Sequence, residues 1–167
     1  MNKNIVRYIG QKVIKMSICC FAGHNSDYNE KTRTDLYKEC EKIITKNNCN
    51  EFWVGNYGGF DKLAAAVIRD LKKLYPFIQL NLILPYLTKE INDYPRYYYE
   101  KYDSLIMADI PLNTPHQYKI IKANQYMVKK SDFLICYIKY SFGGAIKTYE
   151  YAKKQKNIKI INIARKI

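Results

Sequence analysis

The stretch DFLICYIKYSFGGAIKTYEYAKKQKNIKIINI, from Asp132 to Ile163, holds two short apolar runs on either side of a segment with helical pattern. The runs at 132–138 and 158–163 have the length and composition of buried strands, and residues 143–156 have those of a helix that begins at a glycine pair. Two buried strands joined through a helix form the crossover unit of a parallel sheet. This stretch therefore predicts an α/β fold.

The same alternation of strand and helix extends back to Met16. Strands are expected at 16–22, 51–55 and 78–85, and helices at 31–47, 59–76 and 116–131. Residues 86–115 are less regular and interrupted by prolines, and they could hold a short strand at 104–108. Apolar strands alternating with helices predict one domain, residues 16–167, with a mainly parallel sheet flanked by helices on both faces. Residues 1–15 fit this pattern poorly and could form an extra strand or helix, or be disordered.

Composition indicates a soluble globular protein of 167 residues, with a net charge of +13. The longest apolar run is far short of the roughly 18 residues that a membrane span needs, and the first residues lack the apolar core of a secretory signal. The five cysteines form no CxxC pair, and their odd number without framework spacing favours reduced thiols. We therefore expect a cytoplasmic protein with no membrane partner.

Neither a metal site nor a cofactor is expected, because the two histidines, His24 and His116, lie in different segments without a cluster of further ligands. The basic charge could attract nucleic acid. However, the lysines are spread over the whole chain, and no RNA-recognition, zinc-finger or KH signature is present. Nucleic acid is therefore a possible partner but not the favoured one.

Glycine-bearing turns follow three of the expected strands. Their candidate ligand-binding residues are Gly23, His24 and Asn25, then Gly58, Gly59 and Asp61, and then Gly143, Gly144, Lys147 and Thr148. In an open parallel sheet the carboxyl ends of the strands share one edge, where ligands bind. Glycine lets the backbone approach a ligand closely, and the helix that follows offers free N–H groups to a phosphate. Each turn alone could be only a turn, but three at one edge favour a site for a phosphate-bearing ligand.

The turns do not match the standard phosphate-binding motifs. The chain contains neither GxGxxG nor GxxxxGK[ST], so the sequence supports neither a standard dinucleotide fold nor a P-loop ATPase.

The stretches CCFAGHN, GNYGGFDKLAAAVI, NQYMVKKSDFLICY and GGAIKTYEYAKKQKNIKIINI resemble, in this order, the YpsA-like branch of the SLOG superfamily. The resemblance implies a Rossmann-like, doubly wound sheet and a pocket for nucleotides or nucleotide-derived ligands. It also implies that Gly143 and Gly144 lie on the phosphate side and that the Thr148 hydroxyl donates to a phosphate. His24 and Asn124 match residues of the family's motifs. Relatives often assemble, so a homo-oligomer is also expected.

The chain departs from the family at positions that matter for catalysis. Asn25 and Ala123 stand where the YpsA-like branch has arginines, and Ala145 stands where it usually has a threonine. In LOG enzymes, which belong to the same superfamily, an arginine and a glutamate after the glycine loop form the catalytic pair. Glu150 has the spacing of that glutamate but lacks the arginine partner, so it is either a catalytic residue or a helix-surface residue.

Other candidates also have structural interpretations. His24 could stack on a base or contact a phosphate, or it could bond only to backbone. Asp61 could bind ribose hydroxyls or complement the helix dipole. Lys147 could supply charge to a ligand or remain solvated. The tyrosines in 94–102 could stack on adenine, line an oligomer interface or form one half-buried helix face.

The favoured function is that of a sensor or sequestering protein that binds an ADP-ribose-like, cyclic or other nucleotide without strong catalysis. One alternative is a LOG-like nucleoside-monophosphate phosphoribohydrolase, an N-glycosidase that would use Glu150. The other alternative is a basic nucleic-acid-binding module. The missing arginines favour binding over turnover.

Overall fold

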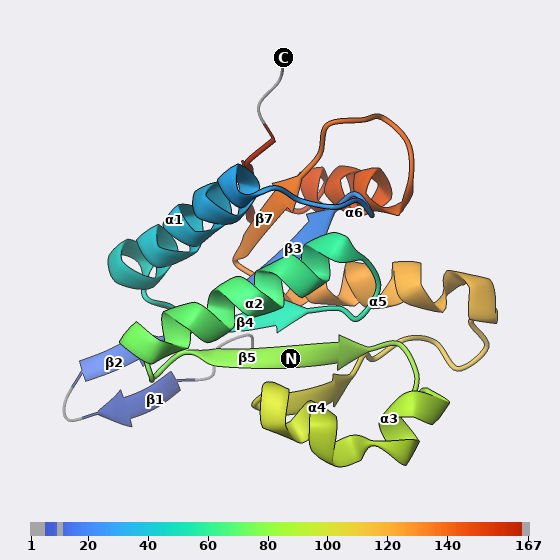
Figure 1. Ribbon diagram of the computed structural model, residues 1–167, viewed down its shortest axis with the longest axis horizontal. Coiled ribbons are helices and arrows are strands. Elements are labelled where there is room, and N and C mark those ends of the chain that lie inside the picture. Colours follow the sequence, from blue (N-terminus) through green and yellow to red (C-terminus); the bar gives the residue numbers. More distant parts are fainter. Residues whose placement is uncertain (1–5, 10–11, 165–167) are drawn as a thin grey trace.

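A six-stranded parallel sheet forms the centre of the computed structural model, which describes residues 6–9 and 12–164 (Figure 1). Its strands are β3 (Ser17–Gly23), β4 (Cys49–Val54), β5 (Gln79–Leu84), β6 (Ser104–Met107), β7 (Phe133–Tyr137) and β8 (Lys159–Asn162). The strand order is β6-β5-β4-β3-β7-β8, and every neighbouring pair is parallel. The expected α/β fold with a parallel sheet is confirmed.

Helices cover both faces of this sheet, as predicted. The helices are α1 (Glu30–Asn47), α2 (Gly59–Leu74), α3 (Lys89–Asp93), α4 (Pro95–Lys101), α5 (His116–Lys130) and α6 (Gly144–Lys153). Side chains alternate between the two faces of a strand. Cys19 and Phe21 pack in the core cluster that includes α1 and α2, whereas Cys20 and Ala22 pack in the cluster that includes α5 and α6 (Figure 1). The central strands are therefore buried on both faces, which explains their continuous apolar character, whereas the edge strands β6 and β8 are only partly buried.

The chain reverses its direction across the sheet between β3 and β7. It proceeds from β3 through β4 and β5 to β6 at one edge, and then returns to place β7 on the other side of β3, followed by β8. A reversal of this kind separates the two loops that leave the neighbouring carboxyl ends, and open α/β sheets bind ligands in the crevice between such loops. The topology therefore directs attention to the loops after β3 and β7.

Two segments were less defined by sequence pattern. Residues before the sheet form an antiparallel pair of strands, β1 (Val6–Ile9) and β2 (Lys12–Lys15), which is one of the possibilities left open for the extension. The proline-rich segment holds α3, α4 and β6. Its tyrosine cluster is divided between environments: Tyr98 is buried in the core, whereas Tyr97 and Tyr99 on either side are exposed.

Candidate functional site

A cleft of about 160 Å³ opens at the carboxyl edge of the sheet, where the chain reverses between β3 and β7. The residues that line it come from β3, the β3–α1 and β4–α2 loops, α2, α5 and α6, and they are Phe21, Ala22, Gly23, Asn25, Tyr57, Asp61, Ile120, Asn124, Gly144, Ala145 and Thr148. Six of the residues singled out from the sequence thus meet in one place: Gly23, Asn25, Asp61, Asn124, Gly144 and Thr148. The other candidates, His24, Gly58, Gly59, Gly143, Lys147 and Glu150, lie outside this lining.

Gly23 ends β3 with no room for a side chain. A Cβ at this position would lie 2.3 Å from Cγ of Phe60, a buried residue in the first turn of α2. The β3 backbone therefore contacts the Phe60 ring directly, and this contact brings the start of α2 against the floor of the cleft.

Asn25 connects the first two glycine turns. Its side-chain Oδ1 accepts a hydrogen bond of 3.2 Å from the backbone N–H of Gly59, the first residue of α2. A Cβ at Gly59 would lie 2.3 Å from the backbone oxygen of Ser26, so the two loops are in close contact. Asn25 thus stabilises the start of α2 in addition to lining the cleft. Gly58 is the N-cap of α2 and has a φ of 126°.

His24 organises the third turn. The backbone N–H groups of Lys139 and Tyr140 both donate to its Nε2 at 3.0 Å, and its ring lies 5.0 Å from that of Tyr140. Burial lowers the pKa of His24, which favours the neutral ring that these two bonds require. In this structure His24 joins the β3–α1 loop to the β7–α6 loop, and so fixes one rim of the cleft.

Asp61 is the only Asp or Glu among the described residues that line the cleft. Its carboxylate accepts hydrogen bonds from the backbone amides of Gly55 and Tyr57, yet burial outweighs them and raises the pKa of Asp61 to about 7. A Cβ at Gly55 would lie 2.9 Å from Asp61 Oδ2, so Gly55 is needed for this close approach. A carboxyl group that titrates near neutral pH can either accept from or donate to a ligand hydroxyl.

Replacing Asp61 with asparagine should change how stability depends on pH. Because the folded-state pKa of about 7 lies above the roughly 3.9 of an unfolded aspartate, folding takes up a proton in this window. As the pH rises from about 4 to about 7, the free energy of unfolding of the wild-type protein should therefore fall relative to that of Asp61→Asn. The expected change is on the order of 1–2 kcal/mol, because solvent in the open cleft beside Asp61 reduces the effect of the pKa shift. Urea denaturation across this range measures the difference.

Asp70→Asn is the matched control for this experiment. Hydrogen bonding to Lys73 lowers the pKa of Asp70, with a smaller contribution from Arg33, so the Asp70 carboxylate stabilises the fold above the unfolded pKa. The free energy of unfolding of the wild-type protein relative to that of Asp70→Asn should therefore fall as the pH is lowered. This is the opposite of the trend expected for Asp61→Asn. If the stability difference between wild-type protein and Asp61→Asn does not change with pH, the shifted pKa of Asp61 is wrong.

The start of α6 forms another wall of the cleft. Its N-cap is Gly143, with φ of 94° and no side-chain cap, so the first-turn N–H groups have no competing side-chain acceptor there. Apart from its chain neighbours and the backbone of its own helix, Gly144 has no described atom within 4 Å of where a Cβ would sit, so there is open space beside this residue. Thr148 is buried, and its hydroxyl makes only a long 3.4 Å bond to the Gly144 carbonyl. This wall suits an anionic group.

Glu150, Ala123 and Lys147 do not line the cleft. Glu150 is exposed on α6, where its Oε1 lies 3.2 Å from Nζ of Lys153. Ala123, which stands in place of a family arginine, is 3% exposed and packs in the core beside the sheet. Lys147 is exposed on α6.

Comparison with known protein families shows the family of this chain. A family model named YpsA and described as the YspA SLOG family matches residues 16–165. The chain belongs to this family. The match spans all six strands of the parallel sheet and all three glycine turns. No curated protein matches this SLOG protein in sequence.

Two solved structures share the fold. The X-ray structure of DNA processing protein A from Streptococcus pneumoniae is 12% identical, with a TM-score of 0.59, and the match covers 87% of this chain and 49% of that one. DNA processing protein A from Helicobacter pylori, described for its single-stranded DNA binding mode, is 12% identical with a TM-score of 0.58, covering 84% of this chain and 62% of that one. The SLOG protein thus spans less than two thirds of either relative, and this similarity shows the fold alone.

Sequence reasoning missed several lining residues. Tyr57 lies between the strand end and the glycine pair, so its position in the turn was a usable signal. Ile120 lies four residues before Asn124 on α5, which places both on one helical face. Phe21 and Ala22 line the cleft because they lie near the carboxyl end of β3. In the sequence, their apolar side chains indicated only that they belong to a buried strand.

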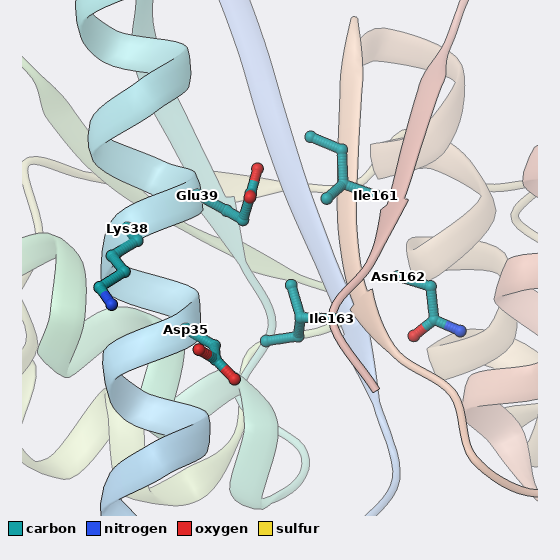
Figure 2. Close-up of a pocket in the computed structure, with 6 residues that line it drawn as sticks. All are labelled: Asp35, Lys38, Glu39, Ile161, Asn162 and Ile163. Atoms are coloured by element: carbon teal, nitrogen blue, oxygen red, sulfur yellow. The ribbon is translucent and has the colours of Figure 1, made fainter. Parts of the chain in front are cut away.

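A second, larger hollow of about 230 Å³ lies between α1 and β8 (Figure 2). Asp35, Lys38 and Glu39 line it from α1, and Ile161, Asn162 and Ile163 line it from the strand side. The side chain of Asn162 is directed away from α1 in Figure 2, and its amide bonds to the backbone of Ile138. This hollow contains none of the glycine turns, so we assign the ligand site to the smaller cleft.

Within the described residues, no helix is both long and apolar enough to cross a membrane. In the same part of the chain, no three histidine, cysteine or carboxylate side chains are grouped as a metal site.

Proposed function

We propose that this SLOG protein binds a nucleotide-derived small molecule in the cleft and acts as a cytosolic sensor or sequestering protein without strong catalysis. One observation carries the proposal: the cleft combines the Asp61 carboxyl group with the uncapped start of α6 at the point where the chain reverses across the sheet. The α6 N–H groups suit a phosphate, and Asp61 suits the hydroxyl groups of a ribose. A nucleotide carries both groups at adjacent positions.

The size of the cleft supports part of a nucleotide as its occupant. Pockets for whole drug-sized ligands have volumes of roughly 300–1,000 Å³. The 160 Å³ of this cleft suits the phosphate and ribose portion. The base of the nucleotide would then lie beyond the rim.

Binding without turnover is supported by the residues at the positions relevant to catalysis. Glu150 forms an ion pair with Lys153 on the helix surface, and both positions of the family arginines hold other residues, Asn25 and Ala123. Cleavage of an N-glycosidic bond needs a group that stabilises the departing base as well as a base for water. The proposal accordingly treats the protein as a binder.

Isothermal titration calorimetry with AMP, ADP-ribose and 3′,5′-cyclic AMP tests this proposal. At least one of them should bind wild-type protein, and Thr148→Val should weaken that binding about tenfold, because valine keeps the shape but removes the hydroxyl donor. Thr45→Val is the control, since the exposed Thr45 hydroxyl bonds within α1. Equal affinity in both variants, or no binding of any nucleotide, would contradict the proposal, as would chromatographic detection of free base released from the titrated nucleotide.

A further inference from the structure

Three aromatic side chains lead outward from the cleft. They are Tyr57, Tyr86 and His116, hereafter the aromatic row. Tyr57 lines the cleft, its ring centroid lies 6.4 Å from that of Tyr86, and the Tyr86 centroid lies 4.7 Å from that of His116. The row therefore begins at the proposed ligand site and extends beyond its rim.

Helix α5 joins the row to the cleft. His116, Ile120 and Asn124 are spaced by four residues and lie on one face of this helix. Ile120 and Asn124 line the cleft, and His116, the first residue of α5, contacts Tyr86 one turn further out. The same helical face thus continues from the cleft to the end of the row.

The row is accessible and held in place. Tyr57 is 36% exposed, Tyr86 is half-buried and His116 is exposed. Burial and a side-chain hydrogen bond with Tyr86 raise the pKa of Tyr57, which keeps its hydroxyl neutral. The ammonium group of Lys119 lies 5.8 Å from the centre of the Tyr86 ring, so a positive charge is also near. Aromatic rings fixed in this way offer flat surfaces at little cost in side-chain entropy.

We infer that the aromatic row is the stacking subsite for the base of the nucleotide whose phosphate and ribose occupy the cleft. This inference rests on the proposed function and adds the place of the base. Bases stack on aromatic side chains with little dependence on base identity. The 160 Å³ of the cleft is below the roughly 300 Å³ typical of pockets that hold a whole ligand, and the row begins with one of the residues that line the cleft.

A second aromatic group on the β7–α6 loop is less suited to this role. Tyr140 and Phe142 stack with centroids 5.5 Å apart and are both exposed. Neither of them lines the cleft as the described residues define it, whereas Tyr57 does. The base is therefore assigned to the aromatic row, and stacking on Tyr140 and Phe142 is the alternative that the experiment tests.

The test compares ribose 5-phosphate with the tightest-binding nucleotide of AMP, ADP-ribose and 3′,5′-cyclic AMP. In wild-type protein the nucleotide should bind about tenfold or more tightly than ribose 5-phosphate, which has no base. Tyr86→Ala should weaken nucleotide binding about tenfold and leave ribose 5-phosphate binding unchanged. Tyr118→Ala is the matched control, because Tyr118 is an exposed tyrosine on the same helix, outside the row. Its nucleotide affinity should equal that of wild-type protein.

The outcomes separate the two proposals. If ribose 5-phosphate binds as tightly as every nucleotide, or if Tyr86→Ala weakens both ligands equally, the base subsite is wrong although the cleft still binds phosphate and ribose. If Phe142→Ala weakens nucleotide binding and Tyr86→Ala does not, the base lies on the β7–α6 loop and the inference is overturned. If neither ribose 5-phosphate nor any nucleotide binds, the proposed function fails and the subsite fails with it.

Discussion

Gly23→Ala should lower the free energy of unfolding by about 2–4 kcal/mol. The new Cβ would lie 2.3 Å from Cγ of Phe60, whose side chain is 1% exposed. The Phe60 ring also packs against Tyr28, with ring centroids 5.3 Å apart, and lies 6.4 Å from the ring of Tyr137. Phe60 cannot move without disturbing these neighbours. Thermal denaturation should show a melting temperature lower by roughly 6–12 °C.

Gly144→Ala is the matched control for this prediction. Gly144 lies at the same edge of the sheet, but apart from its chain neighbours and its own helix backbone, no described atom lies within 4 Å of its ideal Cβ position. Its melting temperature should stay within about 2 °C of the wild-type value. Equal losses in the two variants would contradict the close contact between β3 and Phe60.

Ala145→Glu should strongly weaken nucleotide binding and leave the fold intact. Ala145 lines the cleft in the first turn of α6, where a carboxylate is compatible with the helix dipole. The same carboxylate would repel a bound phosphate and compete for the helix N–H groups. Calorimetry should show affinity weaker by about a hundredfold, with the melting temperature unchanged or slightly higher.

Ala145→Gln separates charge from size in this experiment. Glutamine has nearly the same shape as glutamate but carries no charge, so it should weaken binding much less. If the two variants lose affinity equally, the effect is steric, and the assignment of a phosphate to the start of α6 is wrong.

The sheet and its main helices could be predicted because their signal is local. The central strands are short apolar runs, and α2 and α6 each begin at the second glycine of a glycine pair. The short helices α3 and α4 escaped prediction, although Thr88 caps α3 and Pro95 begins α4. Helices this short depend on tertiary packing, here of Ile91 and Tyr98 in the core.

The glycine turns indicated the location of the cleft but not how its walls are held. The Asn25 bond to Gly59 spans 34 residues, and the His24 bonds to the β7–α6 loop span 115 and 116. Tyr57, Tyr86 and His116 likewise come from three separate segments. No periodicity in the sequence reports contacts between loops, because these depend on how the sheet brings its carboxyl ends together.

The central claim is that a nucleotide-derived ligand occupies the cleft, and a ¹H–¹⁵N correlation NMR titration with AMP, ADP-ribose and 3′,5′-cyclic AMP tests it most directly. For at least one ligand, chemical-shift changes should concentrate at the amides of Gly23, Gly144 and Ala145 and at the side-chain amide of Asn124. Absence of shifts with all three ligands at millimolar concentration, or shifts confined to α1 and β8 around the other hollow, would contradict the account.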